Sequence, residues 1–283
     1  LQAMQLELEL KDYLRQVQEK TSWARKQEEV ARERLAQAER AREFWETLLG
    51  HLANGHYANV LLVLQKSAGY VRHLQETRDP IGPVLEAIGA DAEHRARELA
   101  ATFVRAFPEA VRQAGLEIDP TSRHPVYTFK QGFVRVEIDE RGLAAKVRPR
   151  DGEEIVLGTD IGPLVEKLRT EIARIFDREF QPEPLLKSLY TAYLAALRAE
   201  SRPEGEEVPL RRVTNRLAKN LNRFAYDEFN VDLSRLLQSG HLVIDGRRIQ
   251  FNHTRNARQG MLLYGLEQGG YVGFISFKKE GAP

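Results

Sequence analysis

The sequence contains no cysteine. This absence excludes a disulfide framework, a zinc site with cysteine ligands and a cysteine nucleophile, and it fits a reducing compartment. Apolar runs such as Val60 to Leu64 are far shorter than a membrane-spanning helix. No signal-peptide pattern opens the chain, and Leu1 to Ala3, ahead of Met4, are expected to be extraneous to the natural protein. We therefore expect a cytoplasmic protein without membrane contact.

An excess of charge of one sign is also missing. Lysine and arginine total 42 against 41 acidic residues, so the formal net charge is +1 and indicates no polyanionic partner for the chain as a whole. Hydrophobic residues make up 42% and charged residues 29% of the sequence, a balance typical of folded rather than disordered proteins. With 283 residues, the chain can form one large domain or two to three small ones.

Motifs of catalytic sites are missing or incomplete. The sequence has no glycine-rich phosphate loop ending in Lys-Ser or Lys-Thr, no nucleophile elbow and no His-Glu-x-x-His. Asp91, His94 and Glu98 share one face of an expected helix and could hold a metal, but a surface ion pair is the simpler interpretation. We predict no catalytic residue, no metal and no cofactor.

One incomplete motif keeps a nuclease among the alternatives. Glu137, Asp139 and Lys146 lie on neighbouring expected strands, as the core of a metal-dependent nuclease requires. The acid expected two residues before the lysine is replaced by Ala144. The motif is therefore incomplete for a metal-dependent nuclease.

Glycine and proline are absent from the first 49 residues, which predicts one helix from about Gln5 to Leu49, ended by Gly50. Apolar residues follow a heptad spacing along it and predict a seam that packs on another helix. The candidate partner-binding residues on this seam are Leu10, Leu14, Val17, Ala24, Ala31, Leu35, Ala38 and Trp45. A parallel homodimer would bury Glu28 and Arg42 against their own copies, so we expect an antiparallel partner, most simply the next helix of the same chain.

The following residues predict two more helices. The segment 50–55 has the length of a turn between antiparallel helices, and Tyr57 to Val71 continues the apolar spacing. Asp79-Pro80 predicts the start of a third helix that reaches about Ala114, with a kink or a restart at Pro108. Residues 1–115 therefore form a predicted helical hairpin or coiled-coil arm.

At residue 113 the periodicity changes from helix to strand. Four short β-branched and aromatic runs, separated by the turn signals 139–142 and 151–152, predict a small antiparallel meander. The runs are Val126–Phe129, Phe133–Ile138, Leu143–Val147 and Glu154–Leu157. A helix opened by Thr159 or Asp160 is expected to cover one face, giving a domain at 116–180. Residues 121–150 hold seven basic and three acidic side chains, which fits either a solvated outer face or polyanion binding.

The last third, 181–283, is predicted to be a basic helical domain with β-hairpins. One helix begins at Glu183-Pro184, a second at Val208-Pro209, and a short one spans Val231–Gln238. Asp245-Gly246 is a strong hairpin signal, and Leu262 to Phe277 predicts a further hairpin. Helix, helix, short helix and hairpin is the element order of a winged helix, which this segment resembles.

Positive charge gathers in this last third. Twelve basic and six acidic residues lie from residue 209 to the end, and no acid lies between Pro209 and Tyr226. The candidate nucleic-acid-binding residues are Arg211, Arg212, Arg216, Lys219, Arg223, Arg247, Arg248, Arg255 and Arg258. In one interpretation they follow a phosphate backbone; in the other they form a solvated face or pair with acids elsewhere, such as those of 201–207.

These observations predict an α+β protein that is predominantly α, with a long N-terminal helical hairpin or coiled-coil arm, a small antiparallel β-meander with a helix, and a winged-helix-like C-terminal part. The expected function is a non-enzymatic subunit of a multiprotein complex. Its arm docks a protein partner, and its basic domain contacts nucleic acid, DNA rather than RNA. The alternatives are a pure protein-interaction scaffold and a metal-dependent nuclease, and a homo-oligomer stays open.

Overall fold

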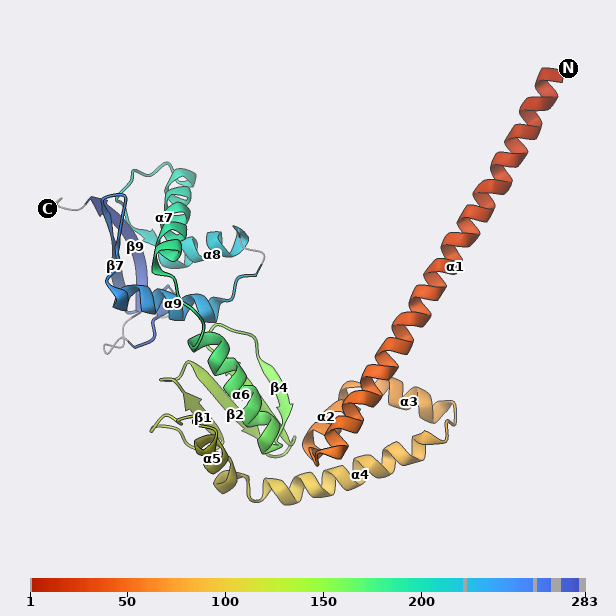
Figure 1. Ribbon diagram of the computed structural model, residues 1–283, viewed down its shortest axis with the longest axis horizontal. Helices are drawn as coiled ribbons and strands as arrows, with labels where there is room; N and C mark the ends of the chain where they lie inside the picture. Colours follow the sequence, from red (N-terminus) through yellow and green to blue (C-terminus); the bar gives the residue numbers. More distant parts are fainter. Residues whose placement is uncertain (1, 221–222, 257–258, 266–270, 280–283) are drawn as a thin grey trace. The chain divides into compact units, whose positions relative to one another are not determined.

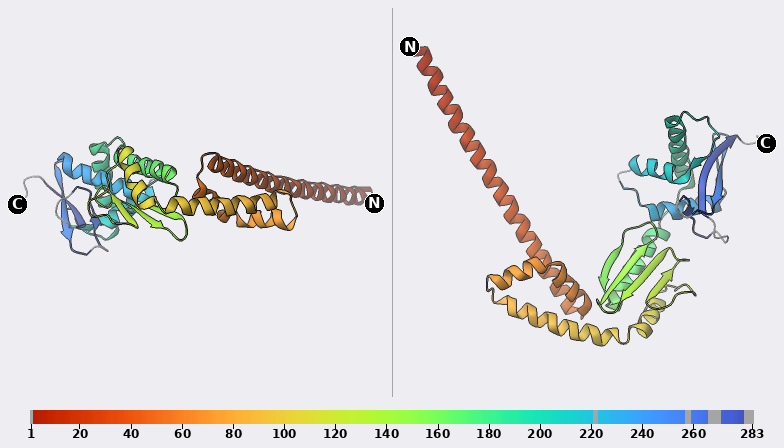
Figure 2. Two further views of the ribbon diagram at one scale, coloured as in Figure 1. Left: turned by 90° about the horizontal axis from the view of Figure 1, so that it is seen from below. Right: turned by 180° about the vertical axis from the view of Figure 1, so that it is seen from behind.

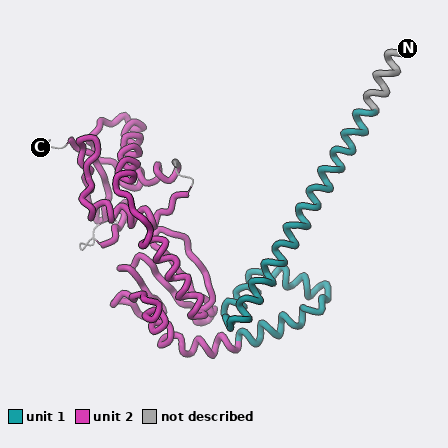
Figure 3. Tube along the Cα trace, in the orientation of Figure 1, with its two compact units in different colours: residues 1–93 teal, residues 94–283 magenta. Residues whose placement is uncertain are grey.

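A computed structural model describes residues 2–220, 223–256, 259–265 and 271–279, with side chains from Tyr13 onward apart from that of Asn220. The fold is α+β and predominantly helical, with a long N-terminal helix and antiparallel sheets (Figure 1). Within the described ranges, every helix is too short or too polar to cross a lipid bilayer. The chain divides into two compact units, residues 1–93 and 94–283 (Figure 3). Compact units are not by themselves folding domains, so the predicted three-domain division stays a prediction.

The first unit is all helical. Its elements are α1 (Gln2–Ala53), α2 (Tyr57–Lys66), α3 (Ala68–Glu76) and the first part of α4 (Ile81–Ala100). The predicted end of α1 at Gly50 is wrong, because the helix continues to Ala53. Gly55, with a φ of 68°, ends it instead: the Gly55 N–H donates to Leu52 O at 3.2 Å and the His56 N–H donates to His51 O at 2.9 Å. These are the two hydrogen bonds of a Schellman cap, whereas Gly50 lies within the helix.

The predicted hairpin is confirmed only at the C-terminal end of α1. Phe44 and Leu48 are buried there with Val60 of α2, Leu74 of α3 and Leu85 of α4. The predicted second helix is interrupted at residue 67, so α2 and α3 are separate helices beside the last turns of α1 (Figure 1).

The heptad seam of α1 lies outside this small core. Leu14, Val17 and Leu35 are 54%, 63% and 61% exposed, and Ala24 and Ala31 are also exposed. Ala38 is exposed and Trp45 is half-buried. The side chain of Leu10 is outside the described set. The expectation that the next helix of the same chain covers the seam is therefore wrong for residues 14–38, because α2 and α3 are short and reach only the end of α1.

The second unit begins within α4 and continues into α5 (Phe103–Gln113). The helix breaks at Ala101 and Thr102, not at the predicted Pro108, which lies inside α5. Phe103 and Phe107 are buried in the core beneath the sheet. This packing outweighs the one backbone hydrogen bond that a proline removes. The last helix assigned to the arm thus contributes to the core of the meander.

The predicted meander is confirmed. Its strands are β1 (Val126–Phe129), β2 (Val134–Asp139), β3 (Ala144–Pro149) and β4 (Ile155–Gly158), antiparallel and side by side in chain order. Val136 faces Val147 in the register and both are fully buried, whereas alternate residues point outward. Helix α6 (Ile161–Phe176) follows Asp160, as predicted, and its apolar side packs on the inner face of the sheet (Figure 2).

The last part has the predicted order of helices and hairpins. Its elements are α7 (Pro182–Ala199), β5 (Val208–Pro209), α8 (Leu210–Asn220), α9 (Tyr226–Ser239), β6 (Val243–Ile244), β7 (Arg247–Thr254), β8 (Met261–Leu262) and β9 (Tyr271–Lys279). The strands form one sheet in the order β5-β9-β7-β6, with β8 also on β9. Two expectations are corrected: β5 occupies the predicted helix start at Val208, and α9 begins at Tyr226 rather than Val231. Asp245 and Gly246 have φ of 48° and 68° and form the predicted hairpin turn.

Candidate nucleic-acid interface

Helix α8 has one apolar and one basic face. Leu210, Val213 and Leu217 are buried in the core shared by α7, α9 and the C-terminal sheet. Residues three, four and seven apart share one face of a helix, and in α8 four polar residues with this spacing lie on the side away from the core. Those residues are Arg212, Asn215, Arg216 and Lys219. The core-facing stripe therefore orients the basic face toward solvent.

The basic face borders an open groove of about 510 Å³, here called the α8 groove. Its lining residues are Ala199, Glu200, Arg212, Asn215, Arg216 and Lys219. Glu200 forms an ion pair with Arg212. Arg216 and Lys219 have no carboxylate partner among the described residues. The groove therefore holds three cations and one carboxylate, a net positive site for an anion.

Two further contacts fix the frame of the groove. Arg211 donates from Nη2 to the carbonyl oxygen of Gly260 at 2.9 Å, which ties α8 to the segment before β8. The Tyr226 hydroxyl donates to Asn215 Oδ1 at 3.2 Å, which ties α8 to the start of α9. Arg211 is thus engaged with the protein backbone, whereas Arg223, just after α8, is exposed.

The arginines of the C-terminal hairpins differ in availability. Arg247 pairs with Glu204 at 2.6 Å and lies over the ring of Tyr190 at 5.9 Å. Burial and a hydrogen bond to Glu204 raise the pKa of Tyr190 to about 12, so this cluster keeps its hydroxyl proton. Arg248 and Arg255 are exposed. Arg258 lies outside the described residues. The structure therefore places Arg247 in an internal contact.

Helix α9 follows α8 in the position that the recognition helix has in a helix-turn-helix pair, the helix that enters the DNA major groove. Here every residue from Asp227 to Leu237 is buried or half-buried. Val231 belongs to the core of the meander, whereas Phe229 and Leu233 belong to the C-terminal core. Helix α9 is thus packed between two cores and is closed to DNA.

An ion-pair network fastens α9 to α6. Arg174 pairs with Asp227 and with Glu228, the latter at 2.6 Å, and also donates to Glu171 at 2.9 Å. Burial opposes the charge of Arg174, but these three carboxylates outweigh burial and raise its pKa. The Asp227 side chain is only 4% exposed. A buried carboxylate needs such partners, so removing Arg174 would leave Asp227 uncompensated.

Further contacts join α9 to the segment just after α6 and to the turn between β3 and β4. Arg178 pairs with Asp232, and Arg235 donates to the carbonyl oxygens of residues 176 and 178. Despite its ion pair, burial raises the pKa of Asp232. A Cβ atom on Gly152, in the β3–β4 turn, would lie 2.7 Å from Asp227 Oδ2. The meander and the C-terminal part are therefore closely joined around α9.

The outer face of the meander has its own carboxylates. Arg135 pairs with Glu137 at 3.3 Å, and Glu154 pairs with Lys146 at 3.7 Å and with Arg148. The Arg148 hydrogen bond lowers the pKa of Glu154 although burial opposes this. Basic and acidic side chains thus alternate on this face, which fits a solvated surface better than a polyanion site.

The residues considered for a nuclease are placed as follows. Glu137 lies opposite Lys146 in the register of β2 and β3, and Ala144 lies opposite Asp139. Asp139 Oδ1 accepts hydrogen bonds from the backbone of Arg141 and Gly142 at 3.1 and 3.0 Å, which is the role of an aspartate in a turn.

The residues considered for a metal lie on α4. His94 Nε2 lies 3.4 Å from Glu98, and both side chains are largely exposed. Within the described part of the chain, no three histidine, cysteine or acidic side chains gather in a metal-binding arrangement.

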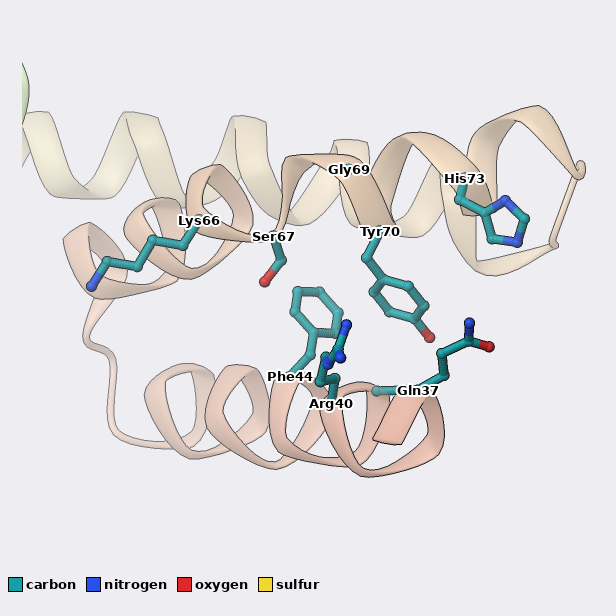
Figure 4. A pocket seen from close by; sticks show the side chains of 9 residues that line it. Gln37, Arg40, Phe44, Lys66, Ser67, Gly69, Tyr70 and His73 are labelled. Carbon is teal, nitrogen blue, oxygen red and sulfur yellow. The ribbon is translucent and has the colours of Figure 1, made fainter. Parts of the chain in front are cut away.

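A second concave site lies within the first unit. A cleft of about 830 Å³ separates α1 from α2 and α3. Phe44 and Arg40 of α1 and Tyr70 of α3 point toward one another in it, whereas Lys66 and His73 extend to either side (Figure 4). The polar groups therefore do not converge on one point, and the α8 groove stays the better candidate for an anion.

Comparisons with protein-family models, with curated proteins and with solved structures found no match. The site therefore has to be judged on its own geometry. Sequence patterns identified the basic face of α8 but missed the pairing of Arg212 with Glu200 and the engagement of Arg211. The missed partners lie on other elements, so no spacing within α8 could reveal them. The acids of α9 at 227, 228 and 232 were a signal that this helix does not face DNA.

Proposed function

We propose that this chain is a non-enzymatic subunit of a multiprotein assembly that contacts the phosphate backbone of nucleic acid through the α8 groove and docks a protein through α1. The supporting observation is the surplus of cations at the groove, where Arg216 and Lys219 have no described carboxylate partner. By contrast, Arg174, Arg178 and Arg247 are all engaged in ion pairs. Cations left at a groove are suited to phosphate oxygens.

Duplex DNA is the proposed ligand, and binding is proposed to be independent of its sequence. The winged-helix element order favours DNA over RNA. Base edges are read by a helix or strand that enters a groove, and α9 is packed between two protein cores. Contacts from α8 to phosphates position a protein on the duplex without selecting a sequence.

The test measures binding of the full chain to a fluorescent DNA duplex by anisotropy at several salt concentrations. Three or so phosphate contacts predict a slope of about −3 in a plot of log affinity against log salt. Arg216→Glu together with Lys219→Glu is expected to weaken binding roughly tenfold or more at low salt, because two phosphate contacts become repulsive.

The matched control is Lys26→Glu together with Arg40→Glu, which makes the same change of charge at exposed positions of α1. It should leave the affinity within about twofold, since neither side chain lines the α8 groove. Equal loss in both variants, or no binding by the unaltered chain at low salt, would refute the nucleic-acid half.

The protein-docking half is supported by the exposed seam on α1. Isolated helices gain little stability without tertiary packing, yet residues 13–35 of α1 carry Leu14, Val17 and Leu35 in the open. A helix with an uncovered apolar stripe is suited to a helical partner. If DNA binding fails its test, a pure interaction scaffold is the function that this stripe still supports.

A further inference from the structure

We infer that the partner of α1 is a second copy of the same helix, aligned antiparallel about a twofold axis near residues 35–38. This inference rests on the protein-docking half of the proposed function and identifies its partner. Three features of α1 carry it: the exposed stripe between residues 24 and 49, the two charged residues within that part of the stripe, and the order of charges along one flank. Leu14 and Val17 lie beyond the residues that this alignment pairs.

The flank is formed by the residues that directly follow Ala24, Ala31, Ala38 and Trp45 of the stripe. From residue 25 onward these are Arg25, Arg32, Glu39 and Glu46, and all four are exposed. The first two are basic and the last two acidic. In an antiparallel pair of helices, such flanking positions face each other in reverse order. Arg32 of one copy then faces Glu39 of the other, and Arg25 faces Glu46.

The twofold axis doubles each of these contacts. A symmetric interface uses the same patch on both copies, so the two pairings occur twice and give four opposite-charge contacts. Arg32 already pairs with Glu28 of its own helix at 2.6 Å, but both side chains are well exposed and water competes for that contact. Glu39 of a second copy can therefore share Arg32.

The core of the same alignment is compatible with the residues present. Leu35 of one copy packs on Ala38 of the other, and Ala24 packs on Leu49, which is 68% exposed. The small alanines let the two backbones approach closely. Glu28 and Arg42 fall in neighbouring layers from opposite copies, where their charges attract.

A parallel alignment fails on the same residues. It would bury Glu28 against Glu28 and Arg42 against Arg42, with like charges close together. Beside the stripe it would bring Lys20 of one copy next to Arg25 of the other, which repel, and Arg34 next to Glu39, which attract, so the flanking charges give a parallel pair no net gain. An oppositely charged foreign helix is not favoured either, because residues 13–49 carry eight basic and seven acidic side chains. The charge pattern is complementary to itself when reversed.

Cysteine cross-linking of the full chain tests the alignment, since the natural sequence has no cysteine and each introduced thiol is unique. The variant Ala24→Cys with Leu49→Cys should form covalent dimers on mild oxidation. These two positions are roughly 37 Å apart along one helix, so a disulfide within the chain is impossible. Each single variant should stay uncross-linked. Cross-linking of both single variants would show a parallel dimer and overturn the inference.

Sedimentation equilibrium tests the charge order. Arg25→Glu with Arg32→Glu should weaken dimerisation roughly tenfold or more, because four attractions become repulsions. Adding Glu39→Arg and Glu46→Arg should restore it. The control Lys26→Glu with Arg40→Glu has the same change of charge at the heptad positions farthest from the stripe and should leave dimerisation intact.

If the chain stays monomeric at a protein concentration of about 100 µM, its dimer dissociation constant is too high for the second copy to be the partner, and the inference is refuted. That result leaves DNA binding untouched, because the anisotropy test uses the α8 groove. Loss of DNA affinity in the Arg216 and Lys219 variant with dimerisation retained would in turn separate the two halves.

Discussion

At the scale of single residues, Glu171 shows how the interior of the second unit handles charge. It is 6% exposed and receives hydrogen bonds from Lys167 at 2.8 Å and from Arg174 at 2.9 Å. Burial raises the pKa of Glu171, but these two bonds outweigh burial and hold it below its ordinary value. The folded state thus binds the proton of this carboxyl less readily than the unfolded state does.

Replacing Glu171 by Gln should therefore cost stability in a pH-dependent way. The contribution of a carboxylate with a lowered pKa is complete above the unfolded pKa, near 4.3, and is lost as the pH falls through the folded pKa. We expect Glu171→Gln to lower the free energy of unfolding by about 1 to 3 kcal/mol at pH 7, and the deficit to shrink below pH 4 or so. Urea unfolding across this pH range measures it.

The control is Glu166→Gln on the same helix. Glu166 pairs with Arg169, but both side chains are about 60% exposed, so the change should be under about 0.5 kcal/mol at any pH. A deficit at Glu171 that is equally large at pH 3 would contradict the lowered pKa.

At the scale of elements, the place where α1 ends predicts how alanine at Gly50 and at Gly55 changes the stability of the first unit. Gly50 lies inside the helix, and a Cβ atom placed on it meets nothing within 4 Å. Gly50→Ala should therefore stabilise the first unit by about 0.5 to 1 kcal/mol, because alanine loses less backbone entropy in a helix. Gly55→Ala should instead destabilise it by about 1 kcal/mol, since its φ of 68° strains a residue with a Cβ. Thermal unfolding compares the two, and the same sign for both would refute this assignment.

The elements that sequence patterns predicted well are those whose signals are local. Strands β1, β2 and β3 of the meander alternate in burial, turn residues separate its four strands, and Asp245-Gly246 marks the C-terminal hairpin directly. The failures have non-local causes. Glycine commonly ends a helix, so Gly50 was predicted to end α1. The helix continues because Leu52, beyond Gly50, packs on the core that α1 forms with α2, α3 and α4, and this contact is tertiary. Proline commonly disturbs a helix, so Pro108 was predicted to do so. The helix continues through it because Phe103 and Phe107 are buried under the sheet, a packing that the local sequence does not reveal.

The candidate site divides in the same way. The spacing of Arg212, Arg216 and Lys219 on one face follows from helical periodicity, so the sequence alone identified it. The engagement of Arg247 with Glu204 and of Arg211 with the Gly260 carbonyl depends on elements far away in the chain. Charge counts could not distinguish these occupied cations from the ones left at the groove.

At the scale of the molecule, α9 determines which fragments can fold. It contributes Val231 to the core of the meander and Leu233 to the C-terminal core, and its acids pair with Arg174 and Arg178 of the preceding segment. A fragment comprising 181–283 would expose Val231 and leave Asp227 without its partner. We expect this fragment to unfold at least 10 °C or so below the fragment 94–283, given the loss of several kcal/mol.

Circular dichroism melting of the two fragments is the measurement. The predicted three-domain division would be supported if 181–283 unfolded cooperatively at the same temperature as 94–283. A lower temperature or a non-cooperative transition would instead make the meander and the C-terminal part a single folding unit.

The burial of α9 also limits what a DNA-bound form of this protein could do. A protein that grips only phosphates meets the same surface at every base pair, so it can move along a duplex without crossing an energetic barrier set by sequence. Its location on a chromosome would then be decided by whatever else is in the assembly. Helix α9, which has the position of a sequence-reading helix, instead packs between the two cores of the second unit.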